Sequence, residues 1–146
     1  MSRTAKNRIK TLMETVRDNF RLDIKGETYY NNTLTDNHIN IGYKSIEETN
    51  LFPAIWVASV SEAGSSLARR IEFDVPFEIE ILGYTKGLDS AMDDALELQS
   101  DIEQSIFQRE RCGLFKFNSF STDVIAIDGF GIVYCVLSGI SEYSKR

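Results

Sequence analysis

Apolar side chains recur along the chain with two different periods, and each period predicts one kind of element. From Thr4 to Phe20, and again from about Asp89 to Gln108, apolar residues return every three or four positions, which predicts two amphipathic helices docked on a core. Ser90 opens the second helix with a Ser-x-x-Asp pattern that favours a capping box. The predicted buried stripe of this helix is Ala91, Ala95, Leu98, Ile102 and Ile106. Its remaining surface is predicted to carry Asp93, Asp94, Glu97, Asp101 and Glu103.

Between the two helices, apolar and polar residues alternate strictly, which predicts one long strand from Leu67 to Ile81. Apolar residues take the odd positions and charged residues the even ones, so one face should pack on the core and the other should be open. Because proline cannot donate to a ladder, Pro76 predicts that this strand lies at an edge or is bulged there. A connection from Ser61 to Ser66 should precede the strand, and a turn from Gly83 to Gly87 should follow it.

Shorter apolar runs predict the other strands. Asp128-Gly129 is a strong two-residue hairpin signal, and the strand after it is apolar on both faces, so it should lie in the centre of the sheet. The predicted strands are His38 to Tyr43, Ala54 to Ala58, Phe115 to Phe117, Thr122 to Ile127 and Phe130 to Ile140.

The order of these elements predicts an α+β fold, with a mainly antiparallel sheet of about five strands and two principal helices packed on one face. Residues 1–146 should form a single domain. Within it, residues 26–50 are predicted to be a loop-rich insertion that exposes Tyr29 and Tyr30, and residues 141–146 a flexible tail.

Composition narrows the class of protein. With 42% hydrophobic and 26% charged residues, the chain should fold without disulfides or metal. The net charge of −6 argues against a protein that grips a phosphate backbone, although the first 25 residues carry seven basic and three acidic side chains. No apolar run approaches the roughly 20 residues of a membrane span, so we expect a soluble protein made without export.

The inventory of reactive groups favours no enzyme, no metal site and no cofactor. His38 is predicted to be a surface histidine, Cys112 an inert thiol and Cys135 a packing residue of the central strand. Glu72, Asp74, Glu78 and Glu80 form one row of the long strand. A row without converging loop ligands seldom binds a cation, so we expect either a channel-facing or a simply solvated acidic surface.

The segment order resembles that of the tail terminator proteins of long-tailed bacteriophages. The resemblance runs from about Thr4 to Glu142 and rests on the basic first helix, on FPAIWV, and on the amphipathic strand RIEFDVPFEIEILGYTK. The acidic helix LDSAMDDALELQSDIEQSI and the closing hairpin complete it. The polar stretch from Lys25 to Asn50 departs from the family pattern.

The resemblance implies a homohexameric ring that caps the head-proximal end of the tail tube of a virion assembled in the host cytoplasm. Such a ring would stop tube growth, bind the tail tube protein and a head-closure or connector protein, and let DNA pass through its lumen without specific binding or catalysis. Candidate ring-interface or lumen residues are Arg70, Glu72, Asp74, Glu78 and Glu80. Candidate tube or connector contacts are Tyr29, Tyr30, Ser65 and Arg69.

Two alternatives stay open at this point. A head-closure or adaptor protein of the head-tail connector has a similar size. A small α+β enzyme or ligand-binding domain is a different class, and its site would lie on the acidic strand face or near Cys112 and His38.

Overall fold

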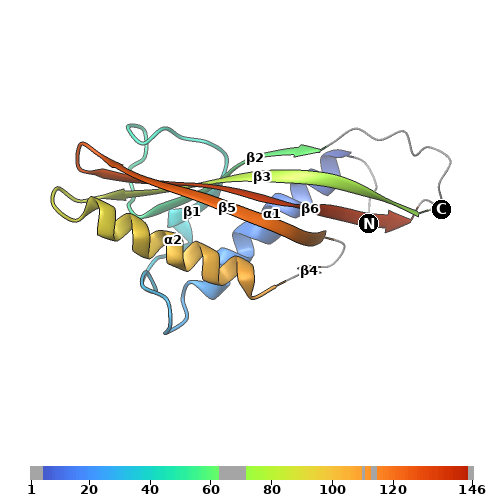
Figure 1. Ribbon diagram of the computed structural model, residues 1–146, viewed down its shortest axis with the longest axis horizontal. Coiled ribbons are helices and arrows are strands. Elements are labelled where there is room, and N and C mark those ends of the chain that lie inside the picture. The colour runs from blue at the N-terminus through green and yellow to red at the C-terminus, as the bar shows by residue number, and fades with distance from the viewer. Residues whose placement is uncertain (1–4, 63–71, 110, 113–114, 145–146) are drawn as a thin grey trace.

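Two helices and six strands account for most of the residues described in the computed structural model (Figure 1). The structure describes residues 5–62, 72–109, 111–112 and 115–144; the side chains of residues 5, 72–74, 111–112 and 142–144 lie outside the description. The helices are α1 (Ala5–Asp23) and α2 (Ala91–Phe107), with a 3-10 turn, η1 (Asp36–His38). The strands are β1 (Ile39–Ile41), β2 (Ala54–Glu62), β3 (Glu72–Lys86), β4 (Arg111–Cys112), β5 (Phe115–Ile127) and β6 (Phe130–Ser144).

The strands form one sheet in the order β1-β2-β3-β6-β5-β4. Only the β1–β2 pair is parallel, and the other pairs are antiparallel. The predicted α+β fold with a mainly antiparallel sheet is therefore confirmed, and β6 is central as its two apolar faces predicted. The sheet exceeds the expected five strands because the two-residue β4 adds a sixth.

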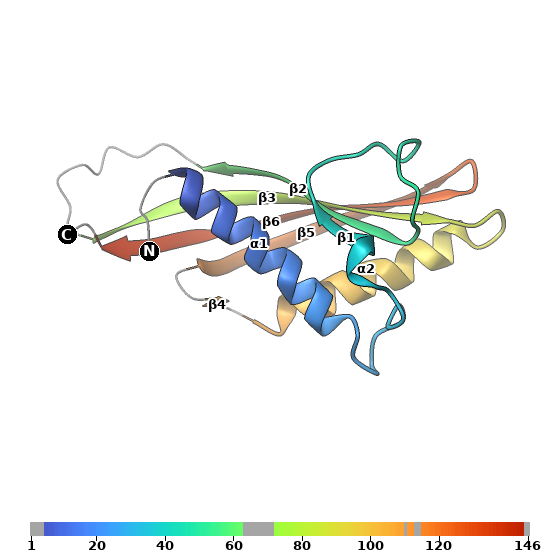
Figure 2. The same ribbon diagram turned by 180° about the vertical axis from the view of Figure 1, so that it is seen from behind.

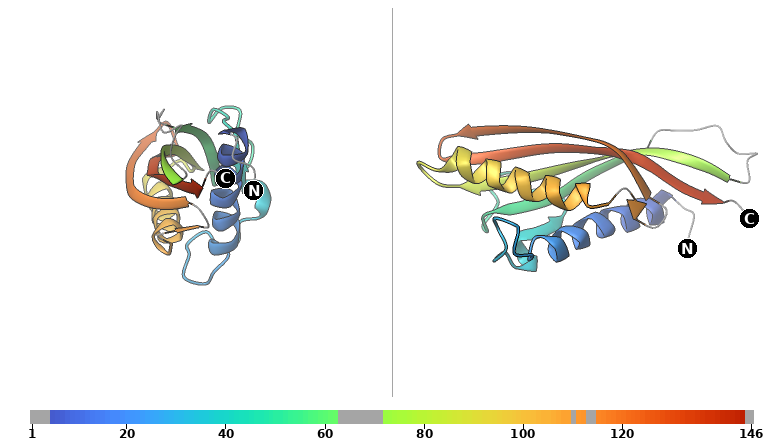
Figure 3. Two further views of the ribbon diagram at one scale, coloured as in Figure 1. Left: turned by 90° about the vertical axis from the view of Figure 1, so that its right-hand side faces the viewer. Right: turned by 60° about the horizontal axis from the view of Figure 1, so that its bottom comes forward.

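Both helices cover the same face of the sheet (Figure 2). On α1, the side chains of Leu12, Val16 and Phe20 are buried, and the helix continues three residues beyond its predicted end. On α2, the whole predicted stripe is buried. On this shared face, α1 packs on β1 and β2, whereas α2 packs on β3, β6 and β5. The two helices therefore cover different strands of the same face (Figure 3).

The prediction that the long strand is an edge strand is wrong. β3 pairs with β2 on one side and with β6 on the other. Pro76 pairs with Ile140 of β6 and lies one residue beyond Phe77, where the described pairing with β2 ends. Pro76 thus lies just outside the described β2–β3 pairing, and its described ladder partner is on β6. The register shifts lie elsewhere, in β2 after Val57 and in β5 after Phe117.

Four strands are longer than predicted, and one of them, β5, runs without a break from Phe115 to Ile127, where two separate strands were expected. The turn expected from Gly83 is wrong because β3 continues to Lys86; Gly83 instead lets α2 approach, since a Cβ there would lie 2.8 Å from the Leu98 side chain. β2 continues through Glu62, where a connection was expected. β6 includes Ser141, which is buried, so the flexible tail predicted from residue 141 is wrong for the described residues 141–144.

The predicted hairpin turn is confirmed, whereas the predicted cap of the second helix is not. Asp128 and Gly129 have φ values of 51° and 79°, the left-handed pair that a two-residue hairpin requires. Ser90 is the N-cap residue of α2, but its hydroxyl donates to the Asp94 carboxylate at 2.8 Å and makes no capping bond. The predicted capping box is therefore wrong, and the carboxylates of the first turn face the helix N-terminus instead.

Candidate functional site on the open face of the sheet

The side chains of β3 divide between a covered and an uncovered face. Phe77, Ile79 and Ile81 are buried beneath the helices, whereas Glu78 and Glu80 are exposed on the face that no described helix covers. Cross-strand partners share a face, so the register identifies the rest of this uncovered surface, which we call the open face. Besides these two acids it comprises Trp56, Ser59, Ser61, Leu82, Ser119, Ser121, Asp123, Ile125, Ile132, Tyr134, Val136 and Ser138. Tyr84 pairs with Ile132 on the same face but is buried, and its hydroxyl donates to the carbonyl oxygen of Lys44 at 2.9 Å.

The centre of the open face combines negative charge with a phenol. Tyr134 pairs with Leu82 on one side and with Asp123 on the other, and its side chain is hydrogen-bonded to Glu80. Desolvation raises the pKa of Tyr134 above its ordinary value, and the Glu80 hydrogen bond and the negative charges of Glu80, Glu78 and Asp123 raise it further. The phenol therefore stays protonated at neutral pH and donates to the Glu80 carboxylate.

The remaining candidates for the ring interface or lumen are placed only in part. The backbones of Glu72 and Asp74 lie in β3, opposite Ser144 and Glu142 of β6, and their side chains lie outside the described residues. Arg70 lies outside the described residues, as do the tube or connector candidates Ser65 and Arg69. Glu78 and Glu80 are thus the two predicted acids that the structure places on the open face.

The prediction that Tyr29 is an exposed contact residue is wrong. Its side chain is 5% exposed, and its hydroxyl oxygen accepts a hydrogen bond from Gln108 Nε2 at 2.7 Å. Burial raises the pKa of Tyr29, the Asp23 charge adds to the shift and the Arg109 charge opposes it. Tyr30, by contrast, is 66% exposed, as predicted. One tyrosine of the pair anchors the loop and the other is presented to solvent.

Asp101 explains this arrangement and was misassigned to the surface of the second helix. It is fully buried, and its carboxylate accepts hydrogen bonds from the backbone N–H groups of Tyr30 and Asn31, each at 2.9 Å. The Asn31 side-chain amide donates a third bond at 2.7 Å. The sequence held one signal for this role, because Asp101 lies three residues after Leu98 of the buried stripe and so shares its helix face. α2 therefore fixes the loop that displays Tyr30.

Two of the groups considered for catalysis, His38 and Cys135, have structural roles. His38 is half-buried, and its Nδ1 lies 2.8 Å from the carbonyl oxygen of Pro53, so it joins η1 to the start of β2. Cys135 packs in the core as predicted, and desolvation raises the pKa of its thiol to about 12. The side chain of Cys112 lies outside the described residues. Among the residues described, no three His, Cys, Asp or Glu side chains are grouped to hold a metal ion.

A shallow cleft lies between the first turns of α2 and the start of β2. Lys86, Asp94 and Glu97 are among its lining residues. The Lys86 Nζ atom lies 5.9 Å from the ring centre of Phe52 and 5.8 Å from that of Phe130. Cation–π contacts with the two rings thus engage the lysine.

Comparison with known proteins gives no family assignment: no protein-family model matches the chain, and no curated protein matches it. Neither helix of the described structure is long and apolar enough to cross a membrane.

Proposed function

We propose that this chain is a tail terminator of a long-tailed bacteriophage. In this role it forms a homohexameric ring on the head-proximal end of the tail tube, stops tube growth and provides the surface on which the head-closure or connector protein docks. The proposal assigns the chain to the virion, with assembly in the host cytoplasm. It requires neither a cofactor nor catalysis.

The observation that carries the proposal is the two-faced sheet. One face is fully occupied by the two helices, and the open face presents Glu78, Glu80 and Asp123 around Tyr134. An acidic wall repels phosphate, so DNA would move past it without the counterion release that holds a duplex on a basic surface. A ring whose lumen is lined by open faces therefore suits a passage for the genome.

The capping role follows from the way rings stack. Tube rings that bind through two different faces continue to stack until a subunit with one matching and one different face joins them. Tyr30, presented by the loop that Asp101 anchors, is our candidate for one such contact surface. The segment order along the chain supports the same assignment.

Electron microscopy of the purified chain mixed with tail tubes tests the proposal. We expect a six-fold ring at one end of each tube, and tubes that stop elongating when the chain is added during assembly. Binding to the head connector without any effect on the tube would favour a head-closure protein instead. Rings absent from tube ends, with normal tube growth in the presence of the folded chain, would contradict the proposal.

A further inference from the structure

Both lateral edges of the sheet contain backbone without a described strand partner. β1 pairs with β2 only over Ile55–Val57, so the outer side of Ala58–Glu62 is unpaired among the residues that the structure describes. Within the same described part, β4 pairs with β5 only at Phe115 and Lys116, which leaves Phe117–Ile127 unpaired on its outer side. Unpaired edges present free N–H and C=O groups that can accept another strand.

The two unpaired stretches lie at one level of the sheet and run in opposite directions. A row of paired residues crosses from Ser59 of β2 to Ser121 of β5, through one residue each of β3 and β6. The successive pairs β2–β3, β3–β6 and β6–β5 are all antiparallel, so β2 and β5 are antiparallel to each other. A rotation about an axis along the strands would set β5 of one copy beside β2 of the next in antiparallel pairing.

An exposed aromatic residue stands beside the β5 edge. Phe107, in the last turn of α2, is 66% exposed and makes an edge-to-face contact with Phe120 of β5, with ring centres 5.7 Å apart. One turn earlier, Glu103 lies on the same side of α2, a helix with five acidic and no basic side chains. Exposed aromatic residues are common anchors of protein interfaces, and here the anchor adjoins an unpaired strand.

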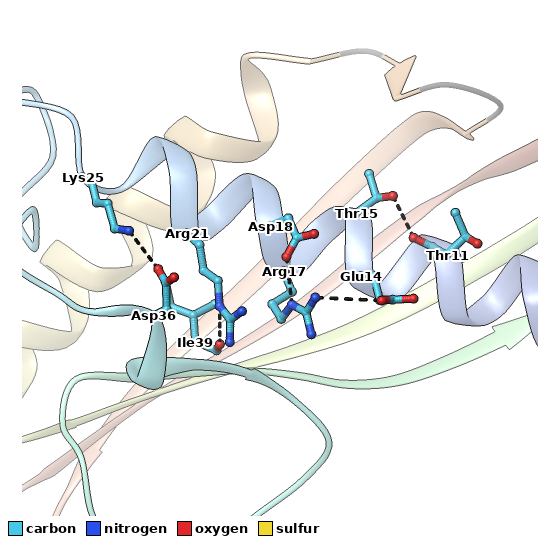
Figure 4. Close-up of polar contacts among 9 residues, drawn as sticks. All are labelled: Thr11, Glu14, Thr15, Arg17, Asp18, Arg21, Lys25, Asp36 and Ile39. Atoms are coloured by element: carbon cyan, nitrogen blue, oxygen red, sulfur yellow. Dashed lines mark hydrogen bonds and ion pairs between the residues drawn. The ribbon is translucent and has the colours of Figure 1, made fainter.

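The opposite flank carries positive charge. Glu62 at the end of β2 pairs with Arg8 at 3.0 Å, which places the N-terminal half of α1 beside the β2 edge. Lys6 and Lys10 are exposed there, and neither forms an ion pair with any described residue. Further along α1, the charge of Arg17 is engaged by its own helix, with Glu14 and Asp18 (Figure 4). The start of α1 is therefore basic, whereas α2, beside the β5 edge, carries acidic and no basic side chains.

We propose that the edge formed by Phe117–Ile127 and Phe107 seats a second copy of this chain through its Ala58–Glu62 edge and the basic start of α1. Antiparallel strand pairing supplies the backbone contact, and the opposite charges of α1 and α2 fix its head-to-tail sense. This inference rests on the proposed ring. It moves the subunit contact away from β3, which is an interior strand. It also makes the open faces of neighbouring copies continuous.

The substitution Phe107→Lys tests the contact on the β5 side. We expect the dissociation constant of the assembly, measured by sedimentation velocity, to rise on the order of ten-fold or more. Leu88→Lys is the matched control, because Leu88 is an apolar side chain that is 91% exposed and lies in the turn between β3 and α2, on neither edge; its assembly should be unchanged. The double variant Lys6→Glu/Lys10→Glu changes the other flank and should also weaken assembly, most strongly at low salt.

Hydrogen exchange supplies a readout that does not depend on a substitution. In the assembled wild-type chain, the amides of Ala58–Glu62 and Asn118–Ser121 should gain protection together, and Phe107→Lys should remove that gain in both. An assembly that Phe107→Lys leaves intact, with freely exchanging edge amides, would overturn this contact and leave the terminator proposal standing. A wild-type chain that stays monomeric with and without tail tubes, and does not cap them, would overturn both.

Discussion

The covered and open faces of β3 differ in what they do for the molecule, although they alternate residue by residue. Ile79 and Ile81 have no exposed surface and pack beneath the two helices. Glu78 and Glu80, their immediate neighbours, are exposed on the opposite face. The stability of the fold therefore depends on one face, and the charge of the other face is free to serve an interaction.

The largest effect should follow from damage to the covered face. Ile79→Ala removes a fully buried side chain at the centre of the sheet, and we expect a loss of about 2–5 kcal/mol in the free energy of unfolding. Glu78→Ala, at the adjacent position, should change it by no more than about 0.5 kcal/mol. Urea unfolding of the two variants measures the contrast; equal losses would mean that β3 does not have the two faces described.

An intermediate effect should follow from loss of the loop anchor. Asp101→Ala removes the acceptor of three hydrogen bonds from Tyr30 and Asn31, and we expect a loss of about 1.5–3 kcal/mol because the acceptor is charged. Faster amide exchange at Tyr30 and Asn31 should accompany it. Ser100→Ala, at the exposed neighbouring position, is the control. Unchanged exchange at both amides would contradict the anchoring role.

On the open face, charge reversal should leave stability nearly unchanged and alter function. Glu78→Lys/Glu80→Lys should still allow tails of normal length, while genome ejection slows because the lumen would then attract phosphate. Salt should restore part of the rate, since charges are screened over about 10 Å at 0.1 M. Ejection kinetics that match wild type at low salt, from particles that contain the variant ring, would put these acids outside the channel.

The smallest effect concerns the titration of Tyr134. Glu80→Gln removes a negative charge that helps to hold the pKa of this phenol above its ordinary value, so the pKa should fall. Because the folded-state pKa is raised, this contribution to stability is complete below the unfolded-state pKa of about 10 and is lost as pH rises above it. Ultraviolet difference titration, with Tyr134→Phe as the reference, measures the pKa of this phenol. A pKa that Glu80→Gln leaves unchanged would show that Glu80 does not act on Tyr134.

Periodic segments were predictable because burial and side-chain spacing agree in them. The buried stripes of both helices, the alternation from Val75 to Ile81 and the Asp128-Gly129 hairpin each followed from spacing alone. The ends of the strands were not predictable, because Gly83 and Ser141 are residue types that are common in turns. Gly83 stays in a strand because α2 packs against it, and Ser141 because it is buried in the sheet. The interior position of β3 likewise depends on which distant strands pair with it.

The polar loop was the least predictable part of the candidate site. Tyr29 and Tyr30 are the same residue type in the same loop, yet the first is buried and the second is exposed. The difference comes from Gln108 and Asp101, which lie more than 70 residues away along the chain. Long-range hydrogen bonds of this kind leave no local periodicity, whereas Glu78 and Glu80 stood in a strand pattern and were identified. Asp123 was missed, because only the pairing of β5 with β6 brings it beside Tyr134.

A reconstruction of the capped end of a tail tube by electron cryomicroscopy tests the central claim most directly. The account predicts a six-fold ring in which the open face of each sheet lines the lumen, with Glu78, Glu80 and Asp123 towards the DNA path and both helices outside. A ring in which α1 and α2 line the lumen and the open face points outward, or a tube end without this chain, would contradict it.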